Sequence, residues 1–299
     1  MQTFLPYADF SASAAVLDNA RLGKQRVETL QILRALELPD YGWRNHPVVR
    51  MWRGRTPALV VYGLTCVRQW CVRGFADSTA EQIAEFSPDV RTADQSELAA
   101  LGLLPGWLGD ERIHESHRSR LVAKDPAFYR PLFPDAPLDL DYFWPPPDDV
   151  PPAPPPGPTD FLWIVRPGTV AALGAFLRHG VVGFGTDAAL DFDIGDLDLA
   201  EIKSALGLSA GRRPGRQVTA VAEFSTLPVP GDRVGVEIEG GGRLLVGEIV
   251  GGYTFQARAA DGWQHHRRTR WETVVPRSAI APPSSLQDVR PFFRVRSAG

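Results

Sequence analysis

The sequence predicts two domains, an all-α domain followed by a smaller domain of α+β type with a β-barrel. Up to residue 143 apolar side chains recur at helical spacing, residues 144–159 are mostly proline, and short strand-like runs follow. The chain has 299 residues, which is enough to bury two cores. We therefore predict a helical domain over 1–143, a linker over 144–159 and an α+β domain over 160–299.

Composition predicts a soluble protein and excludes several classes of protein. The net charge of -3 does not by itself indicate a nucleic-acid partner. The basic residues are nearly all arginine, which favours phosphate and base contacts, although genomic base composition can cause the same bias. The last fifty residues are locally basic.

Cys66 and Cys71 are the only cysteines, which excludes a disulfide framework and a zinc knuckle. We expect both to be small core residues of a cytoplasmic protein. No signal peptide and no membrane-spanning apolar run is recognisable. The expectation is a cytoplasmic monomer without a metal, a cofactor or a membrane partner.

A helix is predicted from about Val16 to Leu36, after a first helical segment that Ser11 or Ser13 is able to cap. Four polar side chains fall into one narrow stripe along it: Arg21, Lys24, Glu28 and Gln31. The opposite face carries leucines for a core, and Val27 and Ile32 flank the stripe, which favours a cleft over open solvent. The alternative is a solvated face with an ordinary Lys24–Glu28 pair, and periodicity by itself favours that alternative.

A loop over Tyr41 to Arg55 mixes aromatic residues with arginines. Its candidate DNA contacts are Arg44, His46, Arg50, Trp52 and Arg53. Interleaved aromatic and arginine side chains suit base stacking and phosphate binding. An equally good interpretation is a surface loop that its two tryptophans anchor to the core.

Further helices are predicted from Thr56 to Arg73, after Asp94, and from Asp110 to just before Pro126. The last one carries His114, His117 and Arg118. Two histidines at this spacing are able to share a metal ion, but no cysteine or carboxylate cluster accompanies them. Phosphate contact or helix packing is therefore the preferred interpretation.

The proline-rich stretch cannot form a helix or a sheet, so we expect an extended, semi-rigid spacer. Beyond it, helices are expected over 169–178 and 198–206. The expected strands cover 161–165, 181–184, 217–224, 233–239, 243–250, 253–258 and 269–275, with a glycine turn at 240–242 closing a hairpin. Many short strands with few helices predict a small β-barrel.

Three segments of the first domain carry a family resemblance: the lead MQTFLP, the helix DNARLGKQRVETLQIL and the closing helix HESHRSRLVAKDPAFYRPLF. Over about Met1 to Phe133 the chain resembles the pyrimidine-dimer DNA glycosylase family, typified by the phage endonuclease V. The resemblance implies an all-α endonuclease V-like domain that excises a base and cleaves the strand at the resulting abasic site.

The resemblance also implies a mechanism. The family's nucleophile is the N-terminal α-amine, which attacks the sugar C1′ and forms an imine, and a glutamate on an early helix assists the elimination. Allowing one inserted residue after Asp18, that glutamate is Glu28. Arg21 stands where the family has a histidine, Gln31 where the phage enzyme has an arginine, and Lys24 is typical of bacterial relatives.

Position 2 departs from the family because Gln2 is too large for the usual removal of methionine. The amine is then expected to belong to Met1, with Lys24 as the alternative. Free α-amines titrate near pH 8, so a useful fraction is nucleophilic at physiological pH. A glutamate beside such an amine is able to stabilise the oxocarbenium charge and to shuttle protons.

The second domain resembles the PUA-like/EVE-like modified-base readers through FLWIVRPG, VVGFG, VPGDRVGVEIEGGGRLLVGEIVGGYTFQ and HHRRTRWETV. Such readers flip a base into an aromatic pocket. The resemblance implies a base pocket among five aromatic candidates: Trp163, Tyr253, Phe255, Trp263 and Trp271. Of these, Trp163, Tyr253 and Trp263 are the pocket residues we choose, and Arg267, Arg268 and Arg270 are the phosphate contacts.

The leading hypothesis is a DNA glycosylase with abasic-site lyase activity that excises a pyrimidine dimer or a modified pyrimidine from double-stranded DNA, guided by a modified-DNA-binding domain. Such an enzyme serves repair or defence against modified foreign DNA. One alternative is a non-enzymatic reader of modified DNA. Another is an RNA-binding PUA-like protein.

Overall fold

The structure, a computed structural model, describes residues 1–148, 161–167, 170–184, 190–206, 208, 214–257, 259 and 263–297. The chain divides into two compact units, Met1–Pro155 and Pro156–Gly299. Most of the expected linker, residues 149–159, lies outside the described residues. Its first residues belong to the helical unit, because Trp144 packs against that core and Asp148 accepts a hydrogen bond from Arg55 at 2.6 Å.

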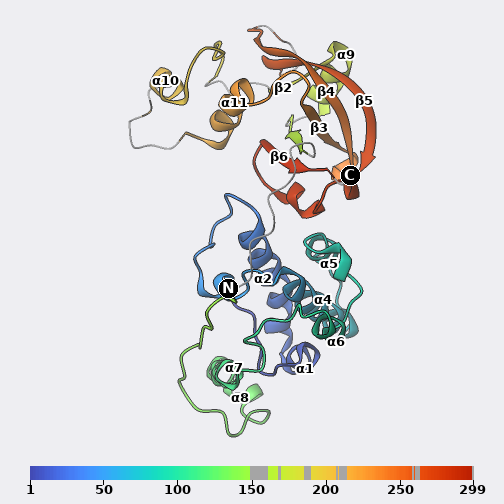
Figure 1. Cartoon of the computed structure of the whole chain (residues 1–299). Helices are drawn as coiled ribbons and strands as arrows, with labels where there is room; N and C mark the ends of the chain where they lie inside the picture. The colour runs from blue at the N-terminus through green and yellow to red at the C-terminus, as the bar shows by residue number, and fades with distance from the viewer. Residues whose placement is uncertain are drawn as a thin grey trace. The chain divides into compact units, whose positions relative to one another are not determined.

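The first unit is helical, as predicted (Figure 1). Its helices are α1 (Phe10–Val16), α2 (Asn19–Glu37), α3 (Pro47–Met51), α4 (Thr56–Val72), α5 (Ala80–Ala84), η1 (Pro88–Val90), α6 (Gln95–Ala100), α7 (Glu111–Lys124) and α8 (Pro126–Tyr129). The apolar helix α4 is central and packs against α1, α2, α5 and α6. Cys66 is buried on α4 as expected, but Cys71 is exposed, which corrects the expectation for that residue.

The helix expected from Val16 to Leu36 is α2, which begins later than expected, at Asn19, because Val16 is the last residue of α1. Leu17 is extended between them, and Asp18 caps α2 by accepting the Arg21 N–H at 2.9 Å. An N-cap residue has a non-helical backbone, so a cap within the run ends the first helix. The leucine face is buried as predicted, with Leu22, Leu30 and Leu33 in the core.

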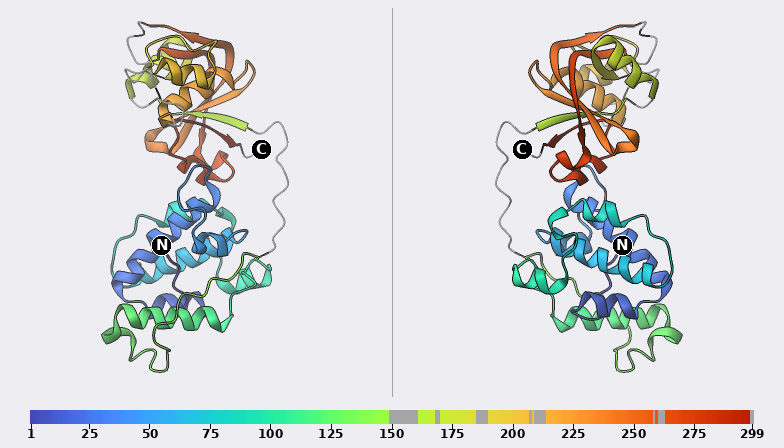
Figure 2. Two further views of the ribbon diagram at one scale, coloured as in Figure 1. Left: turned by 90° about the vertical axis from the view of Figure 1, so that its left-hand side faces the viewer. Right: turned by 90° about the vertical axis from the view of Figure 1, so that its right-hand side faces the viewer.

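The chain enters the fold through a buried segment, Met1–Pro6, which lies between α2 and α7 (Figure 2). Side chains of α2 accept two of its N–H groups: Glu28 from Gln2 at 3.1 Å and Gln25 from Phe4 at 2.8 Å.

Helix α7 holds the next two residues of the segment. His117 accepts the Leu5 N–H through Nδ1 at 2.8 Å, while Nδ1 of His114 donates to the Leu5 carbonyl at 2.8 Å. Arg118 donates to the carbonyl of Pro6 at 2.9 Å. Because buried backbone groups need hydrogen-bond partners, these side chains fix the path of the segment.

The second unit is a mixed six-stranded sheet with helices, in the strand order β2-β5-β4-β3-β1-β6. Its elements are β1 (Phe161–Val165), α9 (Val170–His179), β2 (Val181–Phe184), α10 (Leu199–Ala205), α11 (Arg216–Thr226), β3 (Arg233–Ile238), η2 (Glu239–Gly241), β4 (Arg243–Phe255), β5 (His265–Pro276), η3 (Arg277–Ala279), η4 (Pro283–Gln287) and β6 (Phe292–Arg296). Only the β1–β3 pair among the described strands is parallel. Figure 1 shows the long strands β4 and β5 curving side by side.

Several predicted strands need correction. Residues 217–224 belong to helix α11, because Val221 and Phe224 lie on one helical face and pack into the core, with the Phe224 and Phe292 rings 5.6 Å apart. The two strands expected on either side of Gly251 are one strand, β4, with an irregularity between Ile249 and Tyr253. Strand β6 was not predicted.

The glycine turn does connect an antiparallel pair, β3 and β4, as predicted. Strands β2 and β6 are the two edge strands of the sheet, and no pairing between them is seen among the described residues. Closure of the sheet into a barrel therefore stays a prediction.

The contact between α2 and α4 gives a first test. A Cβ at Gly63 would lie 2.6 Å from Cγ2 of Thr29 and 3.3 Å from Cγ2 of Ile83. Glycine to alanine normally stabilises a helix, but this overpacking should destabilise the protein by about 1–3 kcal/mol in denaturant unfolding.

Gly42→Ala is the matched control, because nothing lies within 4 Å of its Cβ position. Adding Thr29→Ser, which removes the clashing methyl group, should recover most of the lost stability. Equal stability of Gly63→Ala and the parent protein would contradict this packing.

The buried histidine of α7 predicts acid sensitivity. Burial lowers the pKa of His117 to about 3, and the neighbouring His114 adds to this effect. An unfolded histidine titrates near pH 6.5, so between those pH values the unfolded chain binds a proton that the folded chain does not. The free energy of unfolding should therefore fall as the pH falls, by up to about 1.4 kcal/mol per pH unit.

The measurement is urea unfolding followed by helical circular dichroism at about pH 7.5 and about pH 4.5. His117→Gln keeps an acceptor for the Leu5 N–H but does not titrate, so its loss of stability between the two pH values should be smaller. An unchanged pH dependence in this variant would show that another group is responsible.

Candidate active site

A cleft of about 440 Å³ opens beside the start of the chain. It is lined by Met1, Gln2, Phe4, Ala20, Arg21, Lys24, Gln25, Glu28, Lys124 and Tyr142. Three of the four residues in the predicted polar stripe therefore face a cleft, while Gln31 is not among its lining residues. Of the residues that flank the stripe, Ile32 is buried and Val27 is exposed.

Glu28 lines this cleft next to the Met1 amine. Its Oε1 is 3.9 Å from the Met1 α-amine, and its Oε2 accepts the Gln2 N–H at 3.1 Å. The side chain is 23% exposed. The carboxylate is thus fixed next to the amine and is still open to a ligand in the cleft.

Gln25 is a site residue that the sequence analysis missed. It lies one turn before Glu28 on α2, and its Oε1 accepts hydrogen bonds from Phe4 N–H at 2.8 Å and from the Tyr62 hydroxyl at 2.7 Å. Tyr62 is completely buried, and burial raises its pKa well above the ordinary value. Gln25 lies on the buried side of α2 near Leu22 and Ile32, and a single glutamine there carried no distinguishing signal in the sequence.

Arg21 forms one wall of the cleft and is held by acids. Its guanidinium pairs with Asp18 at 3.1 Å and with Asp125 at 3.8 Å. The Tyr129 hydroxyl donates to Asp18 at 2.5 Å. Burial by itself would raise the pKa of Asp18, but the hydrogen bonds from Tyr129 and Arg21 hold it below its ordinary value.

Two lysines line the cleft where the sequence analysis considered one. Lys24 comes from α2 and Lys124 from the end of α7, and both side chains are exposed. Tyr142 closes another side of the cleft. Burial raises the pKa of its hydroxyl, and the Glu28 carboxylate adds to the rise.

His46 lies within electrostatic reach of the amine. Burial and the positive charge of the N-terminal amine lower its pKa, while Glu28 opposes them. Its Nδ1 accepts the Val48 N–H at 3.2 Å and so caps α3. Its ring contacts Trp144 at 6.1 Å between centroids.

The structure corrects three DNA contacts predicted for this unit. Trp52 is fully buried and donates to Oγ1 of Thr3 at 3.0 Å, so it anchors the loop and presents no surface to a base. His114 and His117 are also buried, where they bond to Leu5. Helix packing, the other interpretation of the two histidines, fits the structure.

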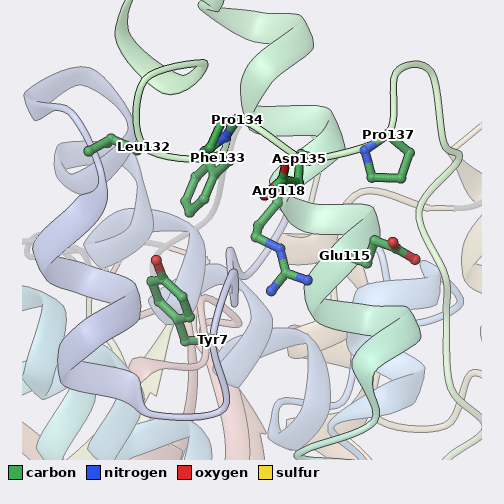
Figure 3. Close-up of a pocket in the computed structure, with 9 residues that line it drawn as sticks. Tyr7, Glu115, Arg118, Leu132, Phe133, Pro134, Asp135 and Pro137 are labelled. Carbon is green, nitrogen blue, oxygen red and sulfur yellow. The ribbon is translucent and has the colours of Figure 1, made fainter.

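Arg118 lies away from the amine, at a second cavity of about 340 Å³ (Figure 3). Tyr7, Phe133 and Glu115 also line that cavity. Since Arg118 pairs with Glu111 and the Pro6 carbonyl, it holds the entering chain. Its contact with DNA stays a prediction.

The aromatic candidates of the second unit lie in different surroundings. Trp163 stacks on Phe292 and donates to Asp232 at 3.0 Å. The Tyr253 hydroxyl bonds to His265 at 2.7 Å. Trp263 is buried in the core, which corrects its assignment to an open base pocket.

Arg267 also needs correction, because it is buried and donates to the carbonyls of Phe224 and Ser225. It is a structural residue. Arg270 pairs with Glu248 and Glu272, and Arg268 is exposed. Of the three predicted phosphate contacts, Arg268 is the one that is exposed and has no acid paired to it among the described residues.

Residues 1–82 match the family model of the pyrimidine dimer DNA glycosylases. The predicted resemblance to this family is thereby confirmed over these residues. The matched stretch contains the amine, Gln25 and Glu28, which line one cleft, and His46, whose pKa the amine lowers. The match supports a general role as a pyrimidine dimer DNA glycosylase and DNA as the substrate. The curated proteins contain no match.

Within the described residues, no cluster of three or more histidine, cysteine, aspartate or glutamate side chains is placed to hold a metal ion. No helix in that part of the chain has the length and apolarity needed to cross a membrane.

Proposed function

We propose that the protein is a DNA glycosylase with abasic-site lyase activity, in which the Met1 α-amine forms an imine with the sugar of a damaged or modified pyrimidine nucleotide. The observation that carries the proposal is the α-amine 3.9 Å from the Glu28 carboxylate in an open cleft. A nucleophile beside a carboxylate is the arrangement that covalent base excision requires.

In the first step the amine nitrogen bonds to C1′ while the glycosidic bond breaks, and the departing base takes the electron pair of that bond. Glu28 stabilises the positive charge that develops on the sugar. The amine then loses a proton and the ring oxygen leaves C1′ as a hydroxyl, which gives the imine. Loss of a proton from C2′ then expels the 3′ phosphate, and Glu28 is placed to accept protons from the reacting groups.

The geometry favours Met1 over the two lysines as the source of the amine. The segment bonded to α2 and α7 holds the Met1 amine, whereas the amines of Lys24 and Lys124 end long, exposed side chains. Flexible ammonium groups suit phosphate contacts. The Gln2 nitrogen is itself 3.1 Å from Glu28, so a chain without Met1 would still present an amine to the same carboxylate.

Further DNA contacts are proposed for residues of the first unit on α2 and on the loop and helix that follow it. Arg44, Arg50 and Arg53 are exposed on the loop and helix that follow α2, and Gln31 is half-buried on α2 itself. Arginines supply phosphate contacts that position a duplex without specifying its sequence. The proposed ligand is double-stranded DNA, bound by a monomer in the cytoplasm.

For the second unit we propose a PUA-like reader that guides the enzyme to damaged or modified DNA, in repair or in defence against foreign DNA. A half-buried Trp163 at a cavity shared with Arg294 and an exposed Arg268 support nucleic-acid contact. When a reader domain holds DNA, the catalytic domain joined to it is present at a raised local concentration near that DNA.

The proposed mechanism predicts a covalent adduct. Borohydride should trap the full chain on abasic-site DNA, and mass spectrometry should find the adduct on the N-terminal peptide. Glu28→Gln should slow trapping and strand cleavage by about 100-fold, because the variant lacks the carboxylate that moves protons. Glu115→Gln, at the second cavity, is the matched control and should behave like the parent protein.

Two results would contradict this mechanism. One is the absence of any adduct with the parent protein. The other is an adduct on Lys24 or Lys124 that disappears in Lys24→Ala/Lys124→Ala, while acetylation of the N-terminus leaves trapping unchanged.

The role of the second unit predicts selective binding. The full chain should bind a duplex with modified bases at least tenfold more tightly than an unmodified duplex or a structured RNA. Arg268→Ala should weaken binding to both duplexes, because a phosphate contact does not depend on the base sequence. Preference for RNA in a competition assay would favour the RNA-binding alternative.

A further inference from the structure

Trp43 combines two features that are unusual for a tryptophan. Its side chain is 68% exposed, although large apolar side chains are normally buried. Its backbone has φ of 71°, in the left-handed region that bulky residues avoid. A costly conformation that displays a large ring to solvent points to a binding role.

The loop holds this ring in place. The Trp43 carbonyl accepts the His46 N–H at 2.8 Å, and its ring contacts the His46 ring at 5.9 Å between centroids. Next to it, Arg44 donates to the Pro39 carbonyl, and Arg53 donates to the Arg44 carbonyl. The tryptophan is therefore presented by a bonded loop, which lowers the entropy cost of stacking on a ligand.

A row of rings joins Trp43 to the amine cleft. His46 contacts Trp144 at 6.1 Å, and Trp144 contacts Tyr142 at 5.4 Å between centroids. Tyr142 lines the cleft, and the N-terminal amine lowers the pKa of His46. The exposed ring thus stands at one end of a continuous aromatic wall whose other end faces Glu28.

The surroundings of Trp43 are cationic. The loop from Tyr41 to Arg55 contains four arginines and no acidic residue. Three of these arginines, Arg44, Arg50 and Arg53, are exposed. A flat aromatic ring among arginines matches a ligand that carries both flat rings and phosphates, which is a nucleic acid.

We propose that Trp43 is a stacking site for a nucleobase of the DNA substrate, at the position next to or opposite the base that is excised. This inference rests on the proposed function, because the stacked base belongs to the DNA on which the proposed glycosylase acts. Stacking there fills the space that a base leaves when it moves toward the amine, and it favours duplexes whose bases are already poorly stacked.

The test uses the full chain and a duplex with a stable abasic-site analogue opposite 2-aminopurine. Trp43→Ala should weaken binding about tenfold and should remove the quenching of 2-aminopurine that stacking causes. Trp43→Phe should keep most of both effects. Leu101→Ala, which truncates an apolar side chain that is 67% exposed on the same unit, is the matched control and should change neither.

The salt dependence of binding separates stacking from phosphate contact. Trp43→Ala should leave the slope of log Kd against log salt unchanged, whereas Arg50→Ala should lower it by about one unit. Circular dichroism and thermal unfolding of each variant establish that it is folded.

Binding and quenching by Trp43→Ala equal to those of the parent protein would overturn the stacking site, even if the parent forms the borohydride adduct. Absence of an adduct with the parent protein would instead overturn the proposed function. A fall in the salt slope for Trp43→Ala would show that the variant disturbs the arginines, and it would also overturn the proposal.

Discussion

The path of the first six residues is the constraint on which the candidate site depends. Their backbone groups bond to side chains of α2 and α7, because the segment is buried where those helices lie on either side of it. Gln25 and Glu28 are three residues apart on one face of α2, so they bond to alternate residues of an extended chain. The same bonds that satisfy the buried backbone place the terminal amine beside a carboxylate.

This arrangement assigns different work to residues that look alike in the sequence. Both histidines on α7 bond to Leu5. Burial lowers the pKa of His117 to about 3, so its ring stays neutral well below the pH at which a free histidine is protonated. The pKa of His46, by contrast, is lowered by the positive charge of the amine, and its ring contacts Trp144 in the row of rings that leads to Tyr142 at the cleft. The proposed catalytic geometry is built from structural hydrogen bonds, because the groups that satisfy the buried backbone also position the amine and Glu28.

In the loop from Tyr41 to Arg55, burial separates two tryptophans for which the sequence allowed the same two interpretations. Trp52 is buried and anchors the loop, as one interpretation predicted, whereas Trp43 is exposed and is not an anchor. Base stacking and phosphate contact by the loop stay a prediction. Both tryptophans are followed directly by an arginine, Arg44 and Arg53, so the neighbouring sequence does not distinguish them. Only the packing of Trp52 against Tyr62 and Trp107 separates them.

The sequence by itself determined the helical class of the first unit, the helix starts after Asp94 and at Asp110, the β3–β4 hairpin and the polar stripe that carries Glu28, because these follow from local spacing and turn chemistry. Tertiary structure decided which polar residues are buried and which of the amines meets Glu28. Residues 217–224 suit both a strand and a helix, and their packing against Phe292 selected the helix. Partners such as Tyr142 and Lys124 lie far from Glu28 in sequence, so only folding brings them to the cleft.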